Sequence, residues 1–539
     1  MPQARSKVNG EQLLCALLLM LGLAYLALYA WADFGGFARL ATADMYEDTL
    51  AARLMWEEKT LFPRSFLFGN QFYVIATPVF AALFYGLTGS MNTAMALATA
   101  LMTLLLLLSL DWMLRPWAKT PLLRLSLLLA AVGLLFGPST IRREDGAQLF
   151  TVMCSFYACY AVTFFVLLGD YTRSLDSPAP RLPALLLSLF LCFATGMQSL
   201  RQTCVSILPL LCVEGFFLLR RLQRREKPLS PSLLRVAAYT AANLAGVGLI
   251  RVLPVRRHTI YTGASLLTGA SLSDKLREIH SALSTVTGYD YTRAGIEGRL
   301  FFCLLFAFCL VLVLAAFRLL VWRRRPEDRA LAVCWWLCVI ACLGVIAASL
   351  LTSVSLRAIY LFPWYFLPPL SLLLLLRRSR PRMRLCLTVL LLCFAGVNLF
   401  FSYRADVETL RDRQPTPAEE LCAYAVENGF ELVYGSHSGT APYIAVHSDG
   451  ALLAGCWEDE VIFKVSPHIN IRDIYSLSDH ERAIFVFQEH ELEAARVETE
   501  ANGTTLTFLG RFGEFYACRA SKQLLYPITE TIDWKPEYN

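Results

Sequence analysis

The stretch LLCALLLMLGLAYLALYAWA, residues 13–32, decides the fold class of this chain. A helix needs about 20 apolar residues to cross the hydrocarbon core of a bilayer, and this run is long enough. Arg5 and Lys7 precede it, and basic flanks of this kind stay on the cytoplasmic side. The sequence AWA at 30–32 resembles a signal-peptidase site, but a signal peptide has only ~7 to 15 apolar residues. We therefore expect an uncleaved anchor with a cytoplasmic amino terminus.

The composition extends this membrane assignment to most of the chain. Of the 539 residues, 56% are hydrophobic and only 17% are charged, and the mean hydropathy is +0.49. A soluble domain has about 25% charged residues. The net charge of +6 does not indicate a nucleic-acid partner, because the basic residues form short clusters at the ends of apolar runs. The sequence predicts a polytopic α-helical membrane protein that does not bind nucleic acid.

The basic clusters set the expected topology, since short loops rich in lysine and arginine remain cytoplasmic. The strongest clusters lie at 220–227, 323–325 and 377–384. If these clusters are cytoplasmic, the apolar runs between them cross the membrane alternately outward and inward. Counting them gives about eleven transmembrane helices, with the amino terminus inside and the carboxyl terminus outside. The expected spans are 13–32, 91–114, 122–137, 147–168, 183–198, 203–219, 233–253, 298–321, 329–351, 358–376 and 384–402. They contain few ionisable residues apart from positions near their ends, such as Asp111 and Arg251.

This topology defines a transmembrane domain, residues 1–409, with three external loops. The loops are 33–89, 137–146 and 254–298. The segment 72–89 cannot be an ordinary complete span if the acidic loop before it is external. We therefore expect 72–89 to form an interfacial or re-entrant helix that is kinked near Pro78.

The last part of the chain, residues 410–539, has mixed polarity. Alternating patterns predict strands at 430–434, 483–487, 505–509 and 515–519, and helices at 419–428 and 490–501. We expect a small external α/β domain. It contains Cys422, Cys456 and Cys518, any two of which could form a disulfide.

The acidic stretch ADMYED, residues 43–48, opens the first external loop. If this stretch is helical, Glu47 and Asp48 lie one turn from Asp44 and share its face. Carboxylates gathered at the mouth of a membrane domain indicate chemistry at the membrane surface. The alternative is a solvated helix N-terminus, where carboxylates favour the helix dipole.

Several short motifs together carry a family resemblance. Asp44 is followed by ARLM at 52–55 and LFPR at 61–64, PSTIRRED occupies 138–145, and RAIYLFP occupies 357–363. This set resembles the GT-C superfamily of membrane glycosyltransferases, which includes the protein mannosyltransferases and the bacterial aminoarabinose transferases. The family opens its first external loop with an Asp-Glu pair, and here Met45 stands where the Glu belongs.

The resemblance implies an inverting glycosyltransferase that takes a sugar from a polyprenyl-phosphate donor. Such a transfer needs a base for the acceptor hydroxyl and cations for the departing phosphate, which guanidinium groups match bidentately. Asp44 is the candidate base, supported by Glu47 and Asp48. The phosphate candidates are Arg142, Arg143, Arg256, Arg257 and Arg357, and the substrate-loop candidates are Asp145, Tyr289, Tyr291 and Tyr360.

Each of these candidates also has a structural interpretation. Arg142 and Arg143 could pair with the adjacent carboxylates, and Arg256 or Arg257 could reach towards lipid headgroups. The loop tyrosines could belong to an interfacial aromatic belt. The triad-like sequence HSD at 447–449 is more typical of a turn before a strand, because adjacent side chains cannot form a relay.

Three classes of function follow from the sequence. The first is the glycosyltransferase, with a polyprenyl-phosphate-linked sugar as donor and a lipid, glycan or protein as acceptor. The second is a transporter or flippase of lipid-linked glycans, and the third is a non-catalytic membrane scaffold that displays its C-terminal domain. No cofactor is indicated, and the chain has no motif for a divalent metal, so a metal requirement stays open. We expect a multi-pass protein of a bacterial plasma membrane with an extracellular C-terminal domain.

Overall fold

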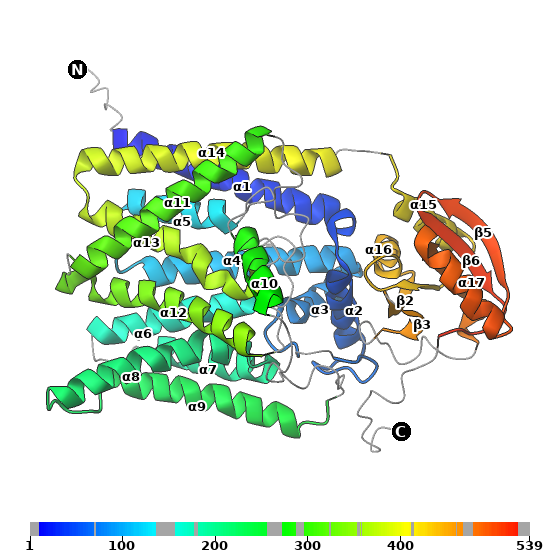
Figure 1. Cartoon of the computed structure of the whole chain (residues 1–539), viewed down its shortest axis with the longest axis horizontal. Coiled ribbons are helices and arrows are strands. Elements are labelled where there is room, and N and C mark those ends of the chain that lie inside the picture. The colour runs from blue at the N-terminus through cyan, green and yellow to red at the C-terminus, as the bar shows by residue number, and fades with distance from the viewer. Residues whose placement is uncertain are drawn as a thin grey trace.

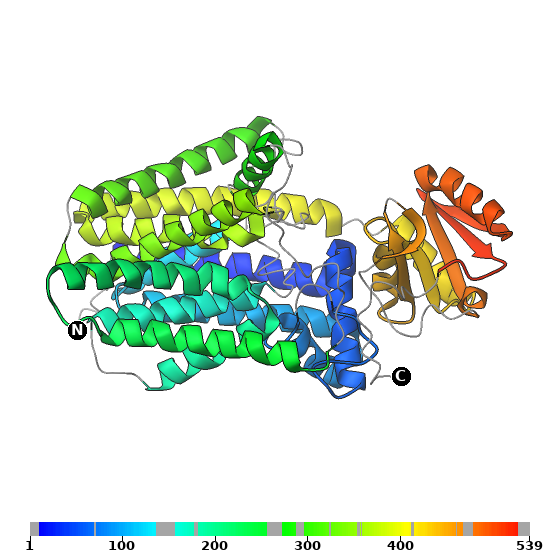
Figure 2. The same ribbon diagram turned by 60° about the horizontal axis from the view of Figure 1, so that its bottom comes forward.

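The chain forms a bundle of long helices followed by a small α/β domain, as the computed structural model shows (Figure 1). The bundle helices run side by side, and the α/β domain lies against one end of them, which the turned view also shows (Figure 2). The structure describes residues 10–68, 72–135, 157–176, 182–255, 272–286, 296–322, 325–352, 356, 358–410, 414–459, 461–466 and 478–525.

Eight of the described helices are long and apolar enough to cross a membrane. They expose large apolar side chains such as Leu23, Leu300 and Phe400, as helices that face lipid do. The eight are α1 (Gly10–Leu40), α4 (Met91–Leu114), α8 (Leu208–Gln223, continuing the π-helix η2 at Thr203–Ile207), α9 (Pro231–Val252), α11 (Ile296–Trp322), α12 (Arg329–Leu351), α13 (Leu367–Arg378, preceded by the 3₁₀ segment η5 at Ala358–Phe366) and α14 (Pro381–Leu410). The polytopic helical membrane fold is therefore confirmed.

These eight helices coincide with eight of the eleven predicted spans. The runs at 122–137 and 183–198 correspond to the shorter apolar helices α5 (Pro121–Leu135) and α7 (Leu182–Gln198). The run at 147–168 overlaps α6 (Ala158–Asp176), and its first half lies outside the described residues. One further helix, α10 (Leu272–Val286), lies in the part of the chain predicted as an external loop.

The first external loop contains two helices, and here one prediction is wrong. Helix α2 (Ala43–Glu57) carries the acidic stretch and lies across the end of the bundle in both views (Figures 1 and 2). Helix α3 (Thr77–Thr88) follows, but Pro78 begins this helix and does not kink it, because proline fits the first turn, where no backbone donor is needed. The two helices are in close contact: a Cβ on Gly86 would lie 2.3 Å from the Trp56 ring.

Two buried carboxylates of the bundle are paired with arginines. Asp170 on α6 accepts from Arg235 on α9 at 2.6 Å and from the Tyr239 hydroxyl. Glu214 on α8, fully buried, accepts from Tyr171 at 2.7 Å and from Arg221 at 3.1 Å. Asp170 and Arg235 lie near the ends of their helices, whereas Glu214 lies within its predicted span, and each of these carboxylates is neutralised by an arginine.

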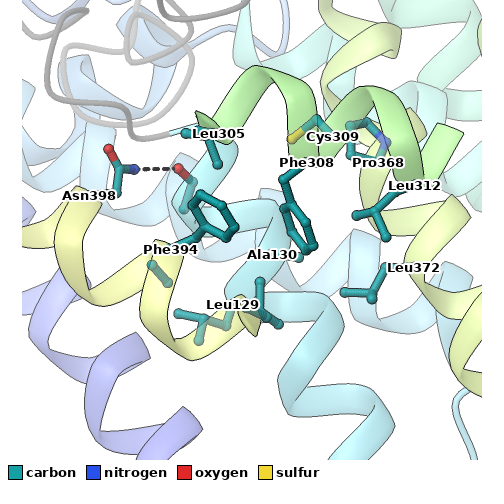
Figure 3. A pocket seen from close by; sticks show the side chains of 13 residues that line it. Leu129, Ala130, Leu305, Phe308, Cys309, Leu312, Pro368, Leu372, Phe394 and Asn398 are labelled. Atoms are coloured by element: carbon teal, nitrogen blue, oxygen red, sulfur yellow. Dashed lines mark hydrogen bonds between the residues drawn. The ribbon is translucent and has the colours of Figure 1, made fainter. Parts of the chain in front are cut away.

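The helices of the bundle are closely packed where α5, α11, α13 and α14 meet. Figure 3 shows an apolar pocket at this place, with the Asn398 amide donating to the Gly133 carbonyl at 2.7 Å. The rings of Phe308 and Phe394 stack inside it with centroids 4.7 Å apart. Its volume of about 30 Å³ leaves room for roughly one water-sized group. We therefore treat this pocket as a packing feature and not as a ligand site.

The α/β domain is built on a six-stranded mixed sheet with the order β3-β2-β1-β4-β6-β5. The central strand β1 is parallel to β2 and β4, whereas β3, β6 and β5 pair antiparallel. The strands are β1 (Leu432–Ser436), β2 (Leu453–Glu458), β3 (Val461–Val465), β4 (Ala483–Gln488), β5 (Leu506–Phe512) and β6 (Phe515–Ala520), and the main helices are α15 (Pro417–Glu427), α16 (Ala441–Ala445) and α17 (Leu492–Ala501).

The interior of the α/β domain is apolar and contains all three of its cysteines. Cys422, Cys456 and Cys518 are buried free thiols, so the disulfide that the sequence left open is not formed. Trp457 stacks on Phe487 with ring centroids 5.2 Å apart. The domain therefore folds around its own hydrophobic core without a covalent crosslink.

The α/β domain docks on the bundle through a turn that the sequence singled out. The sequence HSD at 447–449 forms this turn before β2, as predicted. The Asp449 carboxylate accepts from the Asn92 backbone N–H at 2.8 Å, and the Gly450 carbonyl accepts from Arg53 at 3.0 Å. Gly450 has a φ of +98°, and a Cβ there would lie 2.7 Å from the Met91 sulfur, so glycine permits this close approach.

Candidate functional site

The acidic stretch forms the first turns of α2 and brings three carboxylates to one face. Thr42 caps this helix by accepting a hydrogen bond from the Met45 backbone N–H at 3.3 Å. Asp44 and Glu47 are half-buried, and Asp48 is fully buried. The spacing of three and four residues places their side chains next to one another along the helix. The acidic stretch is therefore helical, as the prediction of a shared carboxylate face required.

Met45 lies away from these carboxylates and packs in the core, with only 1% of its surface exposed. An acidic residue at this position would be buried in apolar surroundings. Met45 thus stands in the core where the resemblance implied a Glu, and the carboxylate face is formed by Asp44 together with Glu47 and Asp48 one turn further on.

Tyr73, in the loop before α3, lies beside the carboxylate face. Its hydroxyl interacts with Asp48 and is close to Glu47 and Asp44. Burial, together with these negative charges, raises the pKa of Tyr73 well above its ordinary value. The phenol therefore keeps its proton and can donate it in a hydrogen bond to the Asp48 carboxylate.

The acidity of Glu47 is strongly altered by its surroundings. Burial raises the pKa of Glu47 to about 8, and the neighbouring charge of Asp44 contributes to the rise. Glu47 therefore carries a proton at neutral pH. Among the described residues, no lysine or arginine lies within ion-pair distance of Asp44 or Glu47. No described cation neutralises these two side chains, and Glu47 instead loses its charge by keeping a proton, a perturbation that is common at functional sites.

A second cluster, formed by Arg201, Tyr157 and Tyr360, lies where α6, the start of η2 and η5 meet. The Arg201 guanidinium carbon is 4.7 Å from the centroid of the Tyr157 ring and 5.6 Å from that of Tyr360. The two rings are themselves 6.3 Å apart, edge to face. The guanidinium also forms a side-chain hydrogen bond with Tyr360, so this tyrosine and the two ring faces orient the positive charge.

Gln198 connects the two clusters. Its side-chain oxygen accepts from the backbone N–H groups of Val74 at 3.0 Å and Ile75 at 2.7 Å, and its backbone carbonyl accepts from Phe72 at 3.0 Å. These residues flank Tyr73, and Gln198 is three positions before Arg201. The loop that presents Tyr73 to the carboxylates is thus fixed to the segment that carries Arg201.

The structure describes four of the predicted site residues. Asp44, Glu47 and Asp48 lie together on α2, whereas Tyr360 lies in the cluster with Arg201. The remaining predicted residues lie outside the described part of the chain. They are Arg142, Arg143, Asp145, Arg256, Arg257, Tyr289, Tyr291 and Arg357.

Arg201 was missed by sequence reasoning, although a signal for it existed. It lies in the short polar segment QSLRQ, residues 198–202, between two apolar runs whose junction the predicted topology places outside. An arginine on that side is less expected from the positive-inside bias. The same criterion selected other external arginines, and applying it to isolated residues as well as to pairs would have found Arg201. Among the described residues, no group of three or more His, Cys, Asp or Glu side chains could hold a metal ion.

Comparisons with known proteins find solved structures of similar fold, two of which are structures of ArnT. The crystal structure of ArnT from Cupriavidus metallidurans bound to undecaprenyl phosphate is 13% identical in sequence, with a TM-score of 0.54 over 96% of this chain and 100% of that chain. The apo structure of the same ArnT is also 13% identical, with a TM-score of 0.45 over 95% of this chain and 98% of that chain. No protein-family model and no curated protein matches the sequence. The chain therefore has an ArnT-like fold, which agrees with the GT-C resemblance drawn from its motifs.

Proposed function

We propose that this protein is an inverting glycosyltransferase that moves a sugar from a polyprenyl-phosphate donor to an acceptor hydroxyl at the external face of the membrane. The observation that carries the proposal is the carboxylate face of α2, held within an ArnT-like fold. A similar fold alone does not imply a similar reaction. The chemistry of the α2 residues supplies the independent support.

Asp44 is the proposed general base. It lies half-buried at the start of α2, so an acceptor hydroxyl can reach it, and it forms no ion pair with a described cation. Glu47 holds its proton at neutral pH because its pKa is about 8, and it can donate a hydrogen bond to the sugar or the acceptor. Asp48 is enclosed with Tyr73 and supports the position of these groups. Two neighbouring carboxyl groups thus receive different roles from their surroundings.

Among the described residues, Arg201 is the cation that we propose for binding the departing polyprenyl phosphate. Negative charge accumulates on that phosphate as the bond to the sugar breaks, and an oriented guanidinium stabilises it. Tyr157 and Tyr360 hold the guanidinium in place. We assign the same role to the other arginines selected from the sequence, which are Arg142, Arg143, Arg256, Arg257 and Arg357.

The proposal is tested by transfer from labelled polyprenyl-phosphate sugars by the purified protein, with the wild type compared with Asp44→Asn. We expect Asp44→Asn to lower the rate by about 10²- to 10⁴-fold, the usual contribution of a general base. Glu57→Gln is the matched control, because it removes a carboxylate from the exposed end of the same helix. Unchanged transfer in Asp44→Asn would reject Asp44 as the base, and an absence of transfer with every donor sugar would favour a scaffold.

The external location is tested separately by labelling introduced cysteines in intact cells with a maleimide that does not cross membranes. Glu57→Cys lies on α2, and Arg380→Cys lies at the opposite end of the bundle, between α13 and α14. We expect the first to be labelled and the second to be protected, after subtraction of the wild-type background. The reverse pattern would reject a site at the external face. The transfer assay tests the chemistry of α2 and does not depend on this result.

A further inference from the structure

A large cavity opens at the end of the bundle that lies away from α2 and the α/β domain. It has a volume of about 760 Å³ and is lined by residues of α8, α11, α12 and α13. Figures 1 and 2 place the end of α8 and the beginning of α12 on the side of the bundle opposite to the sheet. The cavity is therefore separate from the α2 carboxylates and from the Arg201 cluster.

The lining of this cavity is amphipathic. Side chains from α8 and α12, including Val213, Phe217, Trp336 and Ile340, form an apolar wall. Four arginines and a single aspartate among the described residues also line the cavity, at helix ends or in the short connection before α12: Arg220, Arg325, Arg329, Arg378 and Asp328. The walls suit hydrocarbon chains, and the charges suit an anion.

The one carboxylate in the cavity is already neutralised. Asp328 accepts from Arg378, with the Nε atom 2.8 Å from Oδ2, and Arg377 lies 3.5 Å from the other oxygen. Two of the remaining arginines rest on aromatic rings: the Arg220 guanidinium carbon is 4.8 Å from the Phe216 centroid, and that of Arg329 is 5.3 Å from the Phe217 centroid. Excess positive charge therefore remains at the mouth, on exposed guanidinium groups held by stacking.

We propose that this cavity binds an anionic glycerophospholipid of the bilayer. The phosphate of the headgroup is held by Arg220 and Arg329, and the acyl chains lie along the wall formed by α8 and α12. Basic pockets between transmembrane helices are known to suit such headgroups. The volume is within the range of about 300 to 1,000 Å³ that is typical of ligand sites. The site does not depend on the glycosyltransferase proposal, because no residue of the α2 face contributes to it.

The test measures lipid retention by native mass spectrometry of the intact protein, released from nanodiscs that contain equal amounts of phosphatidylglycerol and phosphatidylcholine. We expect the wild type to retain phosphatidylglycerol preferentially. The double variant Arg220→Gln/Arg329→Gln removes two positive charges from the mouth and should lower this retention about tenfold or more. The matched control Arg380→Gln/Arg382→Gln removes two exposed charges at the same end of the bundle, outside the cavity, and should change retention less than twofold.

A second variant tests the apolar wall and keeps the proposal falsifiable if the arginine variant fails to fold. Ala332→Phe narrows the cavity without changing its charge, and should also lower retention of phosphatidylglycerol. An equal loss in the control pair, or full retention in Ala332→Phe, would overturn the site. Competition by glycerol 3-phosphate would show that a free phosphate suffices, and stronger competition by polyprenyl phosphate would identify another lipid. Either result would reject the glycerophospholipid assignment.

Discussion

The two ends of the bundle differ in whether their buried carboxylates are paired with arginines. At the end away from α2, Glu214, Asp170 and Asp328 lie within hydrogen-bond distance of an arginine. At the other end, Asp44 and Glu47 are half-buried on α2 and form no ion pair among the described residues. The first group is neutralised by arginines, whereas the second has no described cation beside it, and Glu47 keeps a proton instead.

Because both groups are at least half-buried, the presence or absence of an arginine partner is what distinguishes a structural carboxylate from one that can take part in a reaction. A buried carboxylate with an arginine and a hydroxyl has its lone pairs satisfied, and a proton acceptor so occupied is a poor base. A buried carboxylate without a cation has a raised pKa, first because burial disfavours its charge and second because of a neighbouring carboxylate, as the value of about 8 for Glu47 indicates. Substitutions that remove one charge at each end should therefore act on different properties.

The largest effect on stability is expected from Asp170→Asn. This change leaves the Arg235 guanidinium, whose side chain is 8% exposed, without its carboxylate. Removing one partner of a buried pair costs about 3 to 5 kcal/mol, so the melting temperature of the purified protein should fall clearly. In Asp170→Asn/Arg235→Gln most of this loss should be recovered. The exposed pair Glu493–Arg496 is the control, and Glu493→Gln should cost less than about 1 kcal/mol. Equal shifts of the melting temperature in Asp170→Asn and Glu493→Gln would contradict a special role for the buried pair.

The next largest effect is expected from Arg201→Gln, and it concerns donor binding. The loss of hydrogen bonds between a guanidinium and a phosphate costs roughly 1.5 to 3 kcal/mol, which corresponds to about a 10- to 150-fold weaker interaction. We expect KM for the polyprenyl-phosphate donor to rise by that order. Arg173→Gln is the control, because Arg173 also stacks on an aromatic ring, at 3.9 Å from Trp112, but lies outside the site. A similar rise of KM in both variants would remove Arg201 from the proposed phosphate site.

A smaller effect, on the pH dependence of stability, is expected from Glu47. The folded protein holds the Glu47 proton up to about pH 8, whereas the unfolded chain releases it near the ordinary pKa of 4.5. Stability should therefore fall as the pH rises through this window, by at most about 1.4 kcal/mol per pH unit for one proton, and level off above it. Glu47→Gln should remove this slope from melting curves recorded between pH 5 and 8.5, and Glu57→Gln should keep it. Parallel curves for the wild type and Glu47→Gln would contradict the proposed protonation state.

The sequence contained the features of the fold that are local. An apolar run of about 20 residues predicts a membrane-spanning helix without information from the rest of the chain. Eight of the predicted spans coincide with described helices. Four predicted strands overlap β1, β4, β5 and β6, whereas β2 and β3 were not predicted. The sequence LAGCWE of β2 contains no alternating pattern, because side chains on both faces of this strand are buried.

The features that the sequence did not indicate depend on distant residues. Asp170 and Arg235 are 65 positions apart, so their neutralisation becomes visible only when α6 and α9 are packed together. Arg201 likewise acquires its surroundings from Tyr157 and Tyr360, which belong to other segments. The carboxylates of α2 are within one turn of each other, and this explains why they were found from spacing alone.

The smallest effect is expected at the contact between α2 and the α/β domain. The Tyr46 hydroxyl accepts from the Ala454 backbone N–H at 2.9 Å, so Tyr46→Phe removes one interdomain hydrogen bond and should cost about 1 kcal/mol. Because Tyr46 lies between Asp44 and Glu47 in the sequence, looser docking should also lower the transfer rate a few-fold. Tyr516→Phe removes a hydroxyl on β6 and should leave the rate unchanged. If Tyr46→Phe lowers the melting temperature but not the rate, then α2 keeps its position without the domain, and the bundle alone organises the carboxylate face.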